Sequence, residues 1–371
     1  MVSNVRRKHR LCSHSTVHST HFIHLILSPQ YLQNGGKVPD IYTKPASLRD
    51  DLQKKLGAFP LHRFWGQLTS IESSQWIADA SIYVDKAYNP TLSLVYLPHL
   101  DYCLQKFGPT DKTVVPSHLR EIDNLVISLI NYYTKAHPNV KIMVLSEYGI
   151  SPVDRVIHIN KELRNSGYVQ VRKENGGETL DCGASDAFAV SDHQIAHIYI
   201  KNKEKDLESV RQLISKIPGI DLVLDSKQQN EYSISSYNSD RSGDLVAVAD
   251  SRSWFSYYYW KDESQAPDFA RCVAIHRKPG YDPAEMLFRF ENSLLGKLYL
   301  FFKIFLIYVL HFRANVDVCP LDGDRIRGSH GIIPKEDTYK PVLISRGLVE
   351  EKEKIRAEDV HDLILKALLN K

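Results

Sequence analysis

The sequence lacks several of the features that assign a chain to a special class of proteins. Its 371 residues contain only five cysteines, irregularly spaced and without a C-x-x-C pair, which favours reduced structural thiols in a reducing compartment. The net charge is only +3 and no long stripe of lysine and arginine is present, so the charge pattern gives no reason to expect nucleic-acid binding. Internal repeats are also absent, which argues against a solenoid or a propeller.

Acidic residues are missing from the first 39 positions. This segment contains Arg6, Arg7, Lys8 and Arg10 and is rich in serine, threonine and histidine. Such a composition is typical of an organelle transit peptide, and an irregular N-terminus is the alternative. Its five histidines have no carboxylate close by, which favours a disordered leader over a metal-binding tract. We therefore expect residues 1–36 to be a basic leader of a soluble intracellular protein, in the cytoplasm or an organelle.

A hydrophobic run long enough to cross a membrane is absent as well. The most apolar stretch, L-Y-L-F-F-K-I-F-L-I-Y-V-L-H-F at residues 298–312, is interrupted by Lys303. It is about 15 residues long, whereas a membrane-spanning helix needs about 20 apolar residues. The stretch therefore predicts a buried helix, or a helix that makes peripheral contact with a membrane surface.

Apolar strands alternate with amphipathic helices from residue 37 onward. The run L-S-L-V-Y-L at residues 92–97 predicts a buried strand, the apolar spacing over 117–136 predicts a helix, and K-I-M-V-L at 141–145 predicts the next strand. This order is typical of a crossover between parallel strands. Further strands are expected at 168–172, 187–190, 195–200, 220–224 and 244–249, and further helices at 160–166 and 204–216. We therefore predict an α/β fold with a layered, mostly parallel central sheet flanked by helices.

No linker rich in proline, glycine or serine divides this region. We therefore expect residues 37–371 to form a single domain, in which about 151–290 is a semi-separate region on the substrate side. The aromatic run W-F-S-Y-Y-Y-W at residues 254–260 could stack a nucleobase or line a pocket. Because aromatic residues favour strands and fill cores, we interpret this run as a core segment.

Three polar clusters could carry chemistry, because ligands of open α/β sheets bind beyond the carboxyl ends of parallel strands. Two of them follow predicted strands and the third is a glycine-flanked turn: P-H-L-D-Y-C-L-Q-K-F-G-P (98–109), S-E-Y-G (146–149) and G-S-H-G (328–331). Asp101, Glu147 and His330 together form the mixture of residue types that binds a divalent metal ion. Taken singly, each is more typical of a helix cap or a solvated turn.

The order of these motifs resembles a known family. A strand with D-x-x-x-[HQ]-x-x-G-P, a strand with S-[DE]-[HY]-G and a late G-x-H-G are similar to the type I phosphodiesterase and nucleotide pyrophosphatase branch of the alkaline phosphatase superfamily. The likeness to bacterial-type members runs from Lys37 to the C-terminal region through four segments: K-V-P-D-I-Y-T (37–43), Y-L-P-H-L-D-Y-C-L-Q-K-F-G-P (96–109), A-F-A-V-S-D-H-Q-I-A-H-I-Y (187–199) and H-R-K-P-G-Y-D-P (276–283). The resemblance implies an alkaline-phosphatase-like fold and metal-dependent hydrolysis of phosphodiester, nucleotide pyrophosphate or phosphonate bonds in a small substrate.

The resemblance also implies two divalent metal ions, zinc or manganese, on either side of the phosphorus. Matched by position, Asp101, residue 105 and His330 hold the first ion, and residues 147 and 148 hold the second with an upstream Asp. The chain departs from this pattern, because Gln105 and Tyr148 replace histidines and Glu147 replaces an aspartate. An amide is a poor zinc ligand, and a phenol with a pKa of about 10 is not a normal one at neutral pH. We therefore interpret S-E-Y-G as the family's metal-binding turn in an altered form.

The attacking group is not found in the sequence. In the family it is a Thr or Ser that lies with a metal-binding Asp on an N-terminal strand and loop, upstream of K-V-P-D-I-Y-T. The 36 residues before Lys37 contain no such combination. We therefore expect either a chain truncated at its start, with the nucleophile further upstream, or a protein that has lost the reaction. The two functions that follow are a hydrolase and a catalytically inactive relative that keeps the fold as a ligand- or partner-binding protein.

Five further residues could bind substrate. His99 lies beside the first polar cluster. His193 belongs to D-H-x-x-x-H, whose histidines could chelate a metal on a helix, but the I-A-H-I-Y-I pattern favours a strand, where they lie about 13 Å apart. His276, Arg277 and Lys278 surround a Pro-Gly turn and could hold a phosphate or carboxylate group, or else form a solvated turn.

Overall fold

The computed structural model describes residues 2–5, 22–27, 30–31, 37–38, 40–231, 242–291, 293–312, 314–346 and 354–369. The chain divides into two compact units. The first unit contains residues 1–102, 116–147 and 341–371, and the second contains residues 103–115 and 148–340. Each unit has its own core of buried apolar side chains, so the two are described separately.

The first unit is built on a four-stranded antiparallel sheet with the order β5-β2-β1-β6. Its strands are β1 (Val2–Val5), β2 (Phe22–Leu27), β5 (Ile41–Lys44) and β6 (Leu92–Val95), and the short strands β3 (Gln30–Tyr31) and β4 (Lys37–Val38) pair with each other. Strands β1, β2 and β3 fall within the segment predicted to be a leader. The other residues of the segment 1–36 lie outside the described residues.

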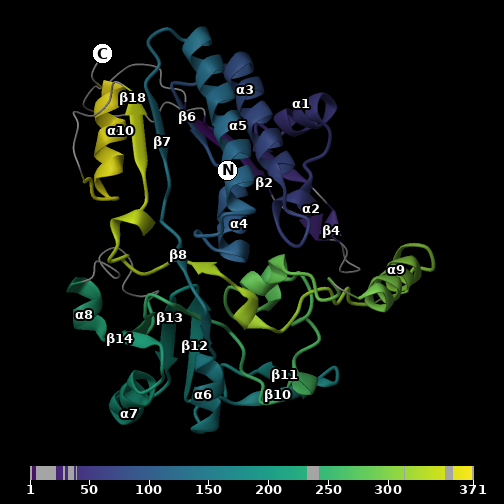
Figure 1. Ribbon diagram of the computed structural model, residues 1–371, viewed down its shortest axis with the longest axis vertical. Coiled ribbons are helices and arrows are strands. Elements are labelled where there is room, and N and C mark those ends of the chain that lie inside the picture. Colours follow the sequence, from purple (N-terminus) through teal and green to yellow (C-terminus); the bar gives the residue numbers. More distant parts are fainter. Residues whose placement is uncertain are drawn as a thin grey trace, which may run out of the picture. The chain divides into compact units, whose positions relative to one another are not determined.

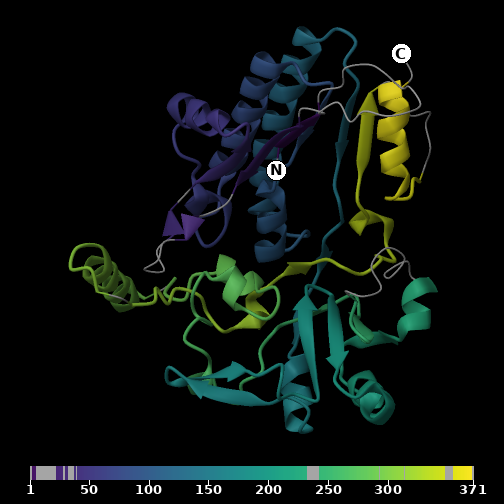
Figure 2. The same cartoon turned by 180° about the vertical axis from the view of Figure 1, so that it is seen from behind.

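Helices α3 and α5 run side by side in the first unit (Figures 1 and 2). Ala78 of α3 packs with Leu125 and Leu129 of α5, as the apolar spacing of the predicted helix requires. Trp76 of α3 and Leu25 of β2 are buried in the same hydrophobic cluster. The helices of this unit are α1 (Ser47–Leu56), α2 (Leu61–Phe64), α3 (Ile71–Tyr88), α5 (Val115–Ala136), α10 (Asp359–Leu369) and the beginning of α4 (His99–Phe107).

The mostly parallel central sheet is not confirmed. Strand β7 (Ile142–Leu145) pairs antiparallel with β18 (Leu343–Arg346), and β6 pairs with β1, so the two strands of the predicted crossover do not pair with each other. Among the described strands, only β9 (Arg155–Ile157) and β16 (Ser253–Phe255) form a parallel pair. The backbone of β7 finds its partner almost 200 residues further along the chain, which the local apolar pattern could not indicate. The fold is a mixed α/β fold.

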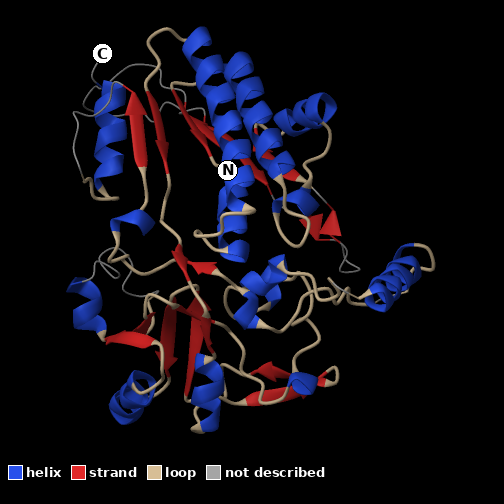
Figure 3. Ribbon diagram, in the orientation of Figure 1, coloured by secondary structure: helices blue, strands red, loops and turns tan. Residues whose placement is uncertain are grey.

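The second unit contains an antiparallel sheet with the order β12-β13-β15-β14. Helix α6 (Ile159–Asn165) lies against β12, and α7 (Lys203–Ser215) lies against β14 (Figure 3). The strands are β12 (Ala187–Asp192), β13 (Ile195–Ile200), β14 (Ile220–Leu224) and β15 (Leu245–Ala249), which confirms the four strands predicted in this region. The alternation of buried and half-buried side chains along β13 explains why its sequence pattern was readable.

The aromatic run at residues 254–260 is a core segment, as predicted. Trp254, Tyr257, Tyr259 and Trp260 are at most 4% exposed. The rings of Tyr257, Tyr259 and Trp260 contact one another edge to face, for example Tyr257 and Trp260 with centroids 5.6 Å apart. Because the rings are covered by the protein, they are not accessible for stacking on a nucleobase.

The remaining elements of the second unit are mostly short. They are β8 (Ser151–Pro152), β10 (Val171–Glu174), β11 (Gly177–Leu180), β17 (Gly328–Ser329), α8 (Ser226–Glu231) and α9 (Leu294–Tyr308). Strands β10 and β11 form a hairpin, and β8 pairs antiparallel with β17. Strand β8 follows the turn S-E-Y-G and β17 lies within G-S-H-G, so this pair joins two of the segments that the sequence predicts to bind metal.

Helix α9 contains most of the apolar stretch at residues 298–312, but the helix is not buried. Leu294, Leu295 and Phe301 are 74%, 79% and 71% exposed. The prediction of a buried helix is therefore wrong, because a helix that is apolar around its circumference cannot be covered by packing on one side. No helix in the described part of the chain is long and apolar enough to cross a membrane.

The buried carboxylate of Asp40 gives a first prediction. Asp40 is 2% exposed and accepts hydrogen bonds from Arg49 (2.7 and 3.0 Å) and Gln53 (3.0 Å). The hydrogen bond from Arg49 is the main cause that lowers the pKa of Asp40 below its usual 3.8. The carboxylate therefore stabilises the fold above pH 3.8, and this contribution is lost as the pH falls through the lowered pKa.

We expect Asp40→Asn to lower the free energy of unfolding at pH 7 by about 1.5–3 kcal/mol, the usual range for a hydrogen bond to a charged group. The difference from the wild type should shrink as the pH falls below 3.8, because the wild-type carboxylate then becomes protonated. Urea denaturation at a series of pH values measures this. Asp50→Asn is the control, since the Asp50 side chain contacts the same Arg49 but is 78% exposed. A difference that stays constant down to pH 3 would contradict the assignment.

Candidate functional site

The turn between β12 and β13 places His193 at the centre of the candidate site. His193 has a left-handed backbone with φ of 56°, which is uncommon for a residue other than glycine. Its carbonyl accepts a hydrogen bond from the Phe255 N–H (2.7 Å), and the Gln194 N–H donates to the His330 carbonyl (2.8 Å). The backbone thus joins the hairpin turn to the G-S-H-G segment and brings two distant histidines together.

Four rings from four separate segments stack on one another, and we name them the ring column: Tyr148, His330, His193 and Tyr281. The centroids of Tyr148 and His330 are 3.6 Å apart with nearly parallel planes (12°). His330 and His193 are 3.7 Å apart, and His193 and Tyr281 are 3.8 Å apart. At the end of the column, the Tyr281 hydroxyl donates a hydrogen bond to Oε1 of Gln105 (3.0 Å). All five residues belong to the second unit.

Asp192 fixes the tautomer of His193. Oδ1 of Asp192 lies 2.5 Å from Nδ1 of His193, so Nδ1–H donates to the carboxylate, and in the neutral ring Nε2 then carries the lone pair. This hydrogen bond is the main cause that lowers the pKa of Asp192, and the nearby histidines lower it further. Burial lowers the pKa of His330 to about 3, with a smaller contribution from His193. His330 is therefore neutral at physiological pH.

Both imidazoles of the ring column have a nitrogen without a partner. Nε2 of His193 and Nε2 of His330 are buried and accept or donate no hydrogen bond within the described ranges. An unpaired buried polar atom is costly, so such atoms call for a ligand. A neutral imidazole nitrogen is the commonest protein ligand of zinc-type ions. The two histidines therefore fit a divalent metal, or a polar group of a substrate.

The two altered positions of the predicted metal site have other contacts. Oε1 of Gln105 accepts the Tyr281 hydroxyl, and its backbone carbonyl accepts the Arg327 N–H (3.0 Å). Tyr148 lies flat against the imidazole of His330. Because the phenol ring is stacked on the imidazole, it limits rotation of the His330 side chain. The structure brings Gln105, Tyr148 and His330 together with His193.

The two predicted carboxylate ligands lie in the first unit. Asp101 is in the first turn of α4, and Glu147 follows β7. Burial raises the pKa of Tyr96, and the negative charges of Asp101 and Glu147 raise it further, to about 12. Both carboxylates therefore lie close enough to one phenol to act on it. The ends of β6 and β7 bring them into the same neighbourhood.

His99 lies in a separate cluster of the first unit. It is the first residue of α4, is 4% exposed, and contacts His118 and Glu121 of α5. Burial is the main cause that lowers the pKa of His99, followed by the neighbouring His118. The sequence interpretation missed His118 and Glu121, although their i, i+3 spacing on an amphipathic helix was a visible signal.

The His276–Lys278 segment does not present three free cations. The Lys278 side chain is 1% exposed, and its ammonium lies 2.7 Å from both Asp282 and Glu285. Burial lowers the pKa of Lys278, but these two carboxylates outweigh it and raise the pKa. Nη2 of Arg277 lies 2.8 Å from Asp268. The charge of Lys278 is thus neutralised inside the protein.

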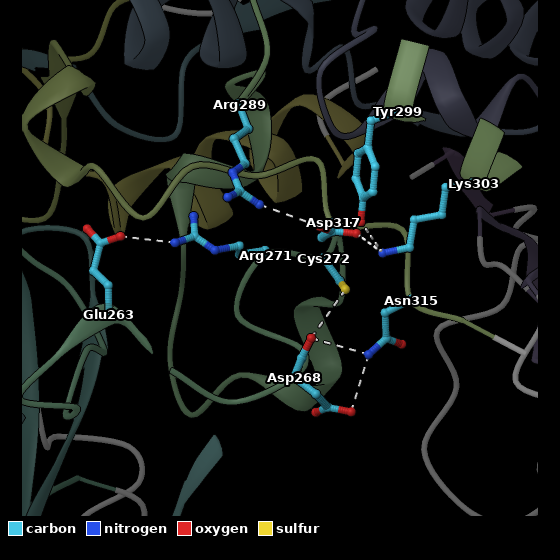
Figure 4. Close-up of polar contacts among 9 residues, drawn as sticks. All are labelled: Glu263, Asp268, Arg271, Cys272, Arg289, Tyr299, Lys303, Asn315 and Asp317. Carbon is cyan, nitrogen blue, oxygen red and sulfur yellow. Dashed lines mark hydrogen bonds and ion pairs between the residues drawn. The ribbon is translucent and has the colours of Figure 1, made fainter. Parts of the chain in front are cut away.

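A pocket of about 430 Å³ lies beside α9 in the second unit, and its lining is charged. Figure 4 shows how these charges pair: Arg271 contacts Glu263 at 3.0 Å, while Asp317 contacts Lys303 and Arg289. Asp268 accepts a hydrogen bond from Asn315 (3.2 Å). Since each cation already faces a carboxylate, the pocket has no evident excess of positive charge for a phosphate group. The pairs hold α9 to the segment around residue 317.

Gly328 allows the turn that carries His330 to lie close to the backbone of Leu104. A Cβ at this position would lie 2.1 Å from the Leu104 carbonyl oxygen and 2.9 Å from the Ile150 side chain. We expect Gly328→Ala to lower the free energy of unfolding by about 1–3 kcal/mol, the usual effect of overpacking, because backbone atoms must move apart. Thermal unfolding measures this, with Gly183→Ala as the control, since a Cβ there meets only the Asp181 side chain at 3.6 Å. Equal melting temperatures for the two variants would contradict the close approach.

Comparison with known proteins identifies relatives of the chain. A family model described as type I phosphodiesterase / nucleotide pyrophosphatase matches residues 7–282. None of the curated proteins compared with the chain matches it.

Solved structures show a distant likeness. Phosphonoacetate hydrolase from Sinorhizobium meliloti 1021, in complex with phosphonoformate, is 14% identical with a TM-score of 0.44, and the match covers 81% of this chain and 56% of the hydrolase. An inactive form of murine ectonucleotide pyrophosphatase / phosphodiesterase 5, in complex with AMP, is 21% identical with a TM-score of 0.37, and the match covers 50% of this chain and 45% of that protein. The chain thus spans about half the length of each of these two proteins.

Proposed function

Because the chain belongs to the type I phosphodiesterase / nucleotide pyrophosphatase family, we propose that it hydrolyses a phosphodiester, nucleotide pyrophosphate or phosphonate bond with the help of a divalent metal, zinc or manganese. The substrate would be a small molecule that carries a phosphate or phosphonate group. The observation that carries this proposal is the ring column, in which two buried imidazoles each keep an unpaired nitrogen. His330 is also the histidine that the motif order assigns to metal binding.

His330 and His193 would hold the metal in the second unit. A bound divalent ion supplies charge stabilisation for the phosphoryl oxygens and lowers the pKa of an attacking oxygen. Asp192 holds His193 in the tautomer whose Nε2 is free, and Tyr148 and Tyr281 limit the rotation of the two imidazoles by stacking on their outer faces. We propose Asp101 and Glu147 as carboxylate ligands in the first unit, where they lie near Tyr96.

A catalytically inactive relative is the second candidate function. Two observations favour it: Gln105 and Tyr148 occupy ligand positions with side chains that are not normal zinc ligands, and both are engaged in contacts with the protein. In that case the ring column would bind a ligand or a partner without turning it over. His276 and Arg277 remain candidates for contacts to a phosphate group in either function.

Metal analysis together with an activity assay separates these functions. For the hydrolase we expect at least one equivalent of zinc or manganese per chain, hydrolysis of bis(p-nitrophenyl) phosphate, and loss of that activity on treatment with a chelator. Re-addition of the metal should restore the rate, which controls for damage by the chelator. A chain that binds metal without hydrolysis supports the inactive relative. A chain without metal and without activity contradicts the hydrolase.

We further propose that α9 makes peripheral contact with a lipid surface. Eleven large apolar residues between 294 and 312 are exposed, and the helix itself contains no acidic residue. We expect the chain to sediment with anionic lipid vesicles and expect Phe301→Ser with Phe302→Ser to weaken this binding at least about 10-fold, since burial of each phenyl ring is worth about 1.5–3 kcal/mol. Ile333→Ser with Val342→Ser removes two exposed apolar side chains elsewhere and is the control. Equal sedimentation of both variants would contradict the contact.

We propose a reducing intracellular location. None of the four cysteines in the described part of the chain, Cys103, Cys182, Cys272 and Cys319, forms a disulfide. Three of them are buried, and burial raises the pKa of Cys272 and of Cys319. Such thiols are inert packing groups, which is the form that cysteine takes in reducing compartments.

A further inference from the structure

Two histidines and a glutamate converge in the first unit, away from every residue of the ring column in the sequence. Nε2 of His99 lies 2.9 Å from Oε2 of Glu121 and 3.0 Å from Nδ1 of His118. Nδ1 of His118 lies 3.7 Å from the same oxygen of Glu121. His99 comes from the first turn of α4, while His118 and Glu121 lie one turn apart on α5. The three donor atoms therefore face one another from two helices.

Hydrogen bonds alone do not explain well why the side chains of His99, His118 and Glu121 lie so close together. The backbone of Ser70 hydrogen-bonds the His99 ring and favours its protonated form, so a ring N–H is engaged as the donor there. In the neutral ring the other nitrogen, Nε2, then carries a lone pair, which faces the Glu121 carboxylate and Nδ1 of His118. A proton on Nδ1 of His118 can be donated to either atom, but the 2.9 Å contact between Nε2 of His99 and Oε2 of Glu121 is then left without a proton. A single proton can bridge only two of the three atoms. A divalent cation can accept all three lone pairs at once.

The spacing of the three atoms suits a zinc-type ion. Metal–ligand bonds of about 2.0–2.2 Å in a tetrahedral site place neighbouring ligand atoms about 3.3–3.6 Å apart. The observed separations of 2.9, 3.0 and 3.7 Å lie on both sides of that value. Two imidazoles and one carboxylate are also a ligand set of zinc sites that keep an open coordination position. Calcium and magnesium prefer oxygen ligands and are disfavoured here.

The surroundings supply the other features of a metal site. The His99 side chain is 3% exposed, and its hydrogen bond to Ser70 would orient the ring, as the outer partners of metal-binding histidines do. The side chains of His118 and Glu121 are 27% and 47% exposed, so the ion could enter from solvent and keep a water molecule on that side.

We propose that His99, His118 and Glu121 bind a divalent transition metal of the zinc type, with solvent at its fourth position. The ion ties the beginning of α4 to α5 within the first unit. It is additional to the metal proposed for the ring column, which belongs to the second unit.

Cobalt(II) tests this proposal, because its visible absorption reports both binding and coordination number. The full chain is stripped with a chelator and titrated with Co²⁺ as the wild type and as His118→Ala, Glu121→Gln and His330→Ala. We expect the wild type to develop the intense bands of a four-coordinate site. In His118→Ala and Glu121→Gln, the affinity of the His99–His118–Glu121 site for Co²⁺ should fall at least about 10–100-fold, since even the loss of a group that only orients a metal ligand has that effect. In His330→Ala the absorption bands of this site should persist.

Asp123→Asn is the matched control, because Asp123 is exposed on the same helix two residues from Glu121 and should bind Co²⁺ like the wild type. Circular dichroism checks the fold of each variant. Glu121→Gln removes the charge of a half-exposed side chain, so its result stands even if His118→Ala fails to fold. Unchanged Co²⁺ affinity in Glu121→Gln, or bands that are lost only in His330→Ala, would overturn the proposal. The second result would still support the metal at the ring column.

Discussion

Hydrolysis of bis(p-nitrophenyl) phosphate should fall at least about 100-fold in kcat/KM when His330 is replaced with alanine, because loss of even a group that only orients a metal ligand costs 10–100-fold. The imidazole of His330 stands between Tyr148 and His193 in the ring column, and its buried Nε2 has no partner among the described residues. Alanine removes this nitrogen and also leaves a gap between two rings. Initial rates at several substrate concentrations, with metal content determined on the same samples, measure the effect.

Two controls separate loss of metal from loss of fold. His158→Ala removes another partly buried imidazole of the same unit, one that hydrogen-bonds Ser256 (2.6 Å), so it reports the damage caused by deleting a ring as such. Tyr148→Phe keeps the stacked ring and removes only the hydroxyl, so it tests whether the phenol oxygen takes part. If His330→Ala keeps the same metal content and the same rate of hydrolysis as His158→Ala, the ring column is not the site of hydrolysis.

Lys278→Met should lower the free energy of unfolding by about 3–5 kcal/mol, the usual result of removing one partner from a buried ion pair. The Lys278 ammonium contacts both Asp282 and Glu285, and all three side chains are 1% exposed. Burial raises the pKa of Asp282 even with Lys278 in place. Methionine has a similar volume, so the main change is that two buried carboxylates lose their only ammonium within this group of three. Urea denaturation of the purified chain measures the loss.

The sign of this prediction can be checked by removing the charges together. Lys278→Met combined with Asp282→Asn and Glu285→Gln should recover part of the lost stability, because no uncompensated carboxylate remains. Arg252→Ala breaks the exposed pair with Asp154 and should cost less than about 1 kcal/mol. If Lys278→Met costs no more than Arg252→Ala, the triad does not hold its loop. Since Tyr281 lies in that loop, the ring column should loosen together with it.

The local sequence patterns predicted the helices and strands well, but they did not predict which strands pair with each other. The strand at 195–200 alternates buried and half-buried residues, and the helix at 117–136 has one apolar face, so each could be recognised from its own residues. The partner of β7 is a strand almost 200 positions away, and nothing in K-I-M-V-L specifies it. The sequence shows that α9 is apolar. It does not show whether another element packs over the helix, so the exposure of its side chains could not be predicted.

The same division holds for the candidate site. Motif order drew attention to Tyr148, His193 and His330, and the structure stacks these three rings on one another. Tyr281 was missed, because its contact with His193 depends on how the loop after residue 275 returns to the hairpin. The Lys278 loop was interpreted as a phosphate-binding or solvated turn because the sequence does not show burial. Its two carboxylate partners were visible at i+4 and i+7.

The distribution of the four tryptophans gives the molecule two built-in optical reporters. Trp65 and Trp76 belong to the first unit, and Trp254 and Trp260 to the second. Indole emission shifts to longer wavelength when the ring becomes hydrated, and Trp76, Trp254 and Trp260 are at most 6% exposed in the native chain. A variant with phenylalanine at positions 254 and 260 would emit from the first unit alone, and one with phenylalanine at 65 and 76 from the second alone. Coincident melting curves for the pair would mean that the two cores are lost in one cooperative event, and separate curves would give each core its own stability.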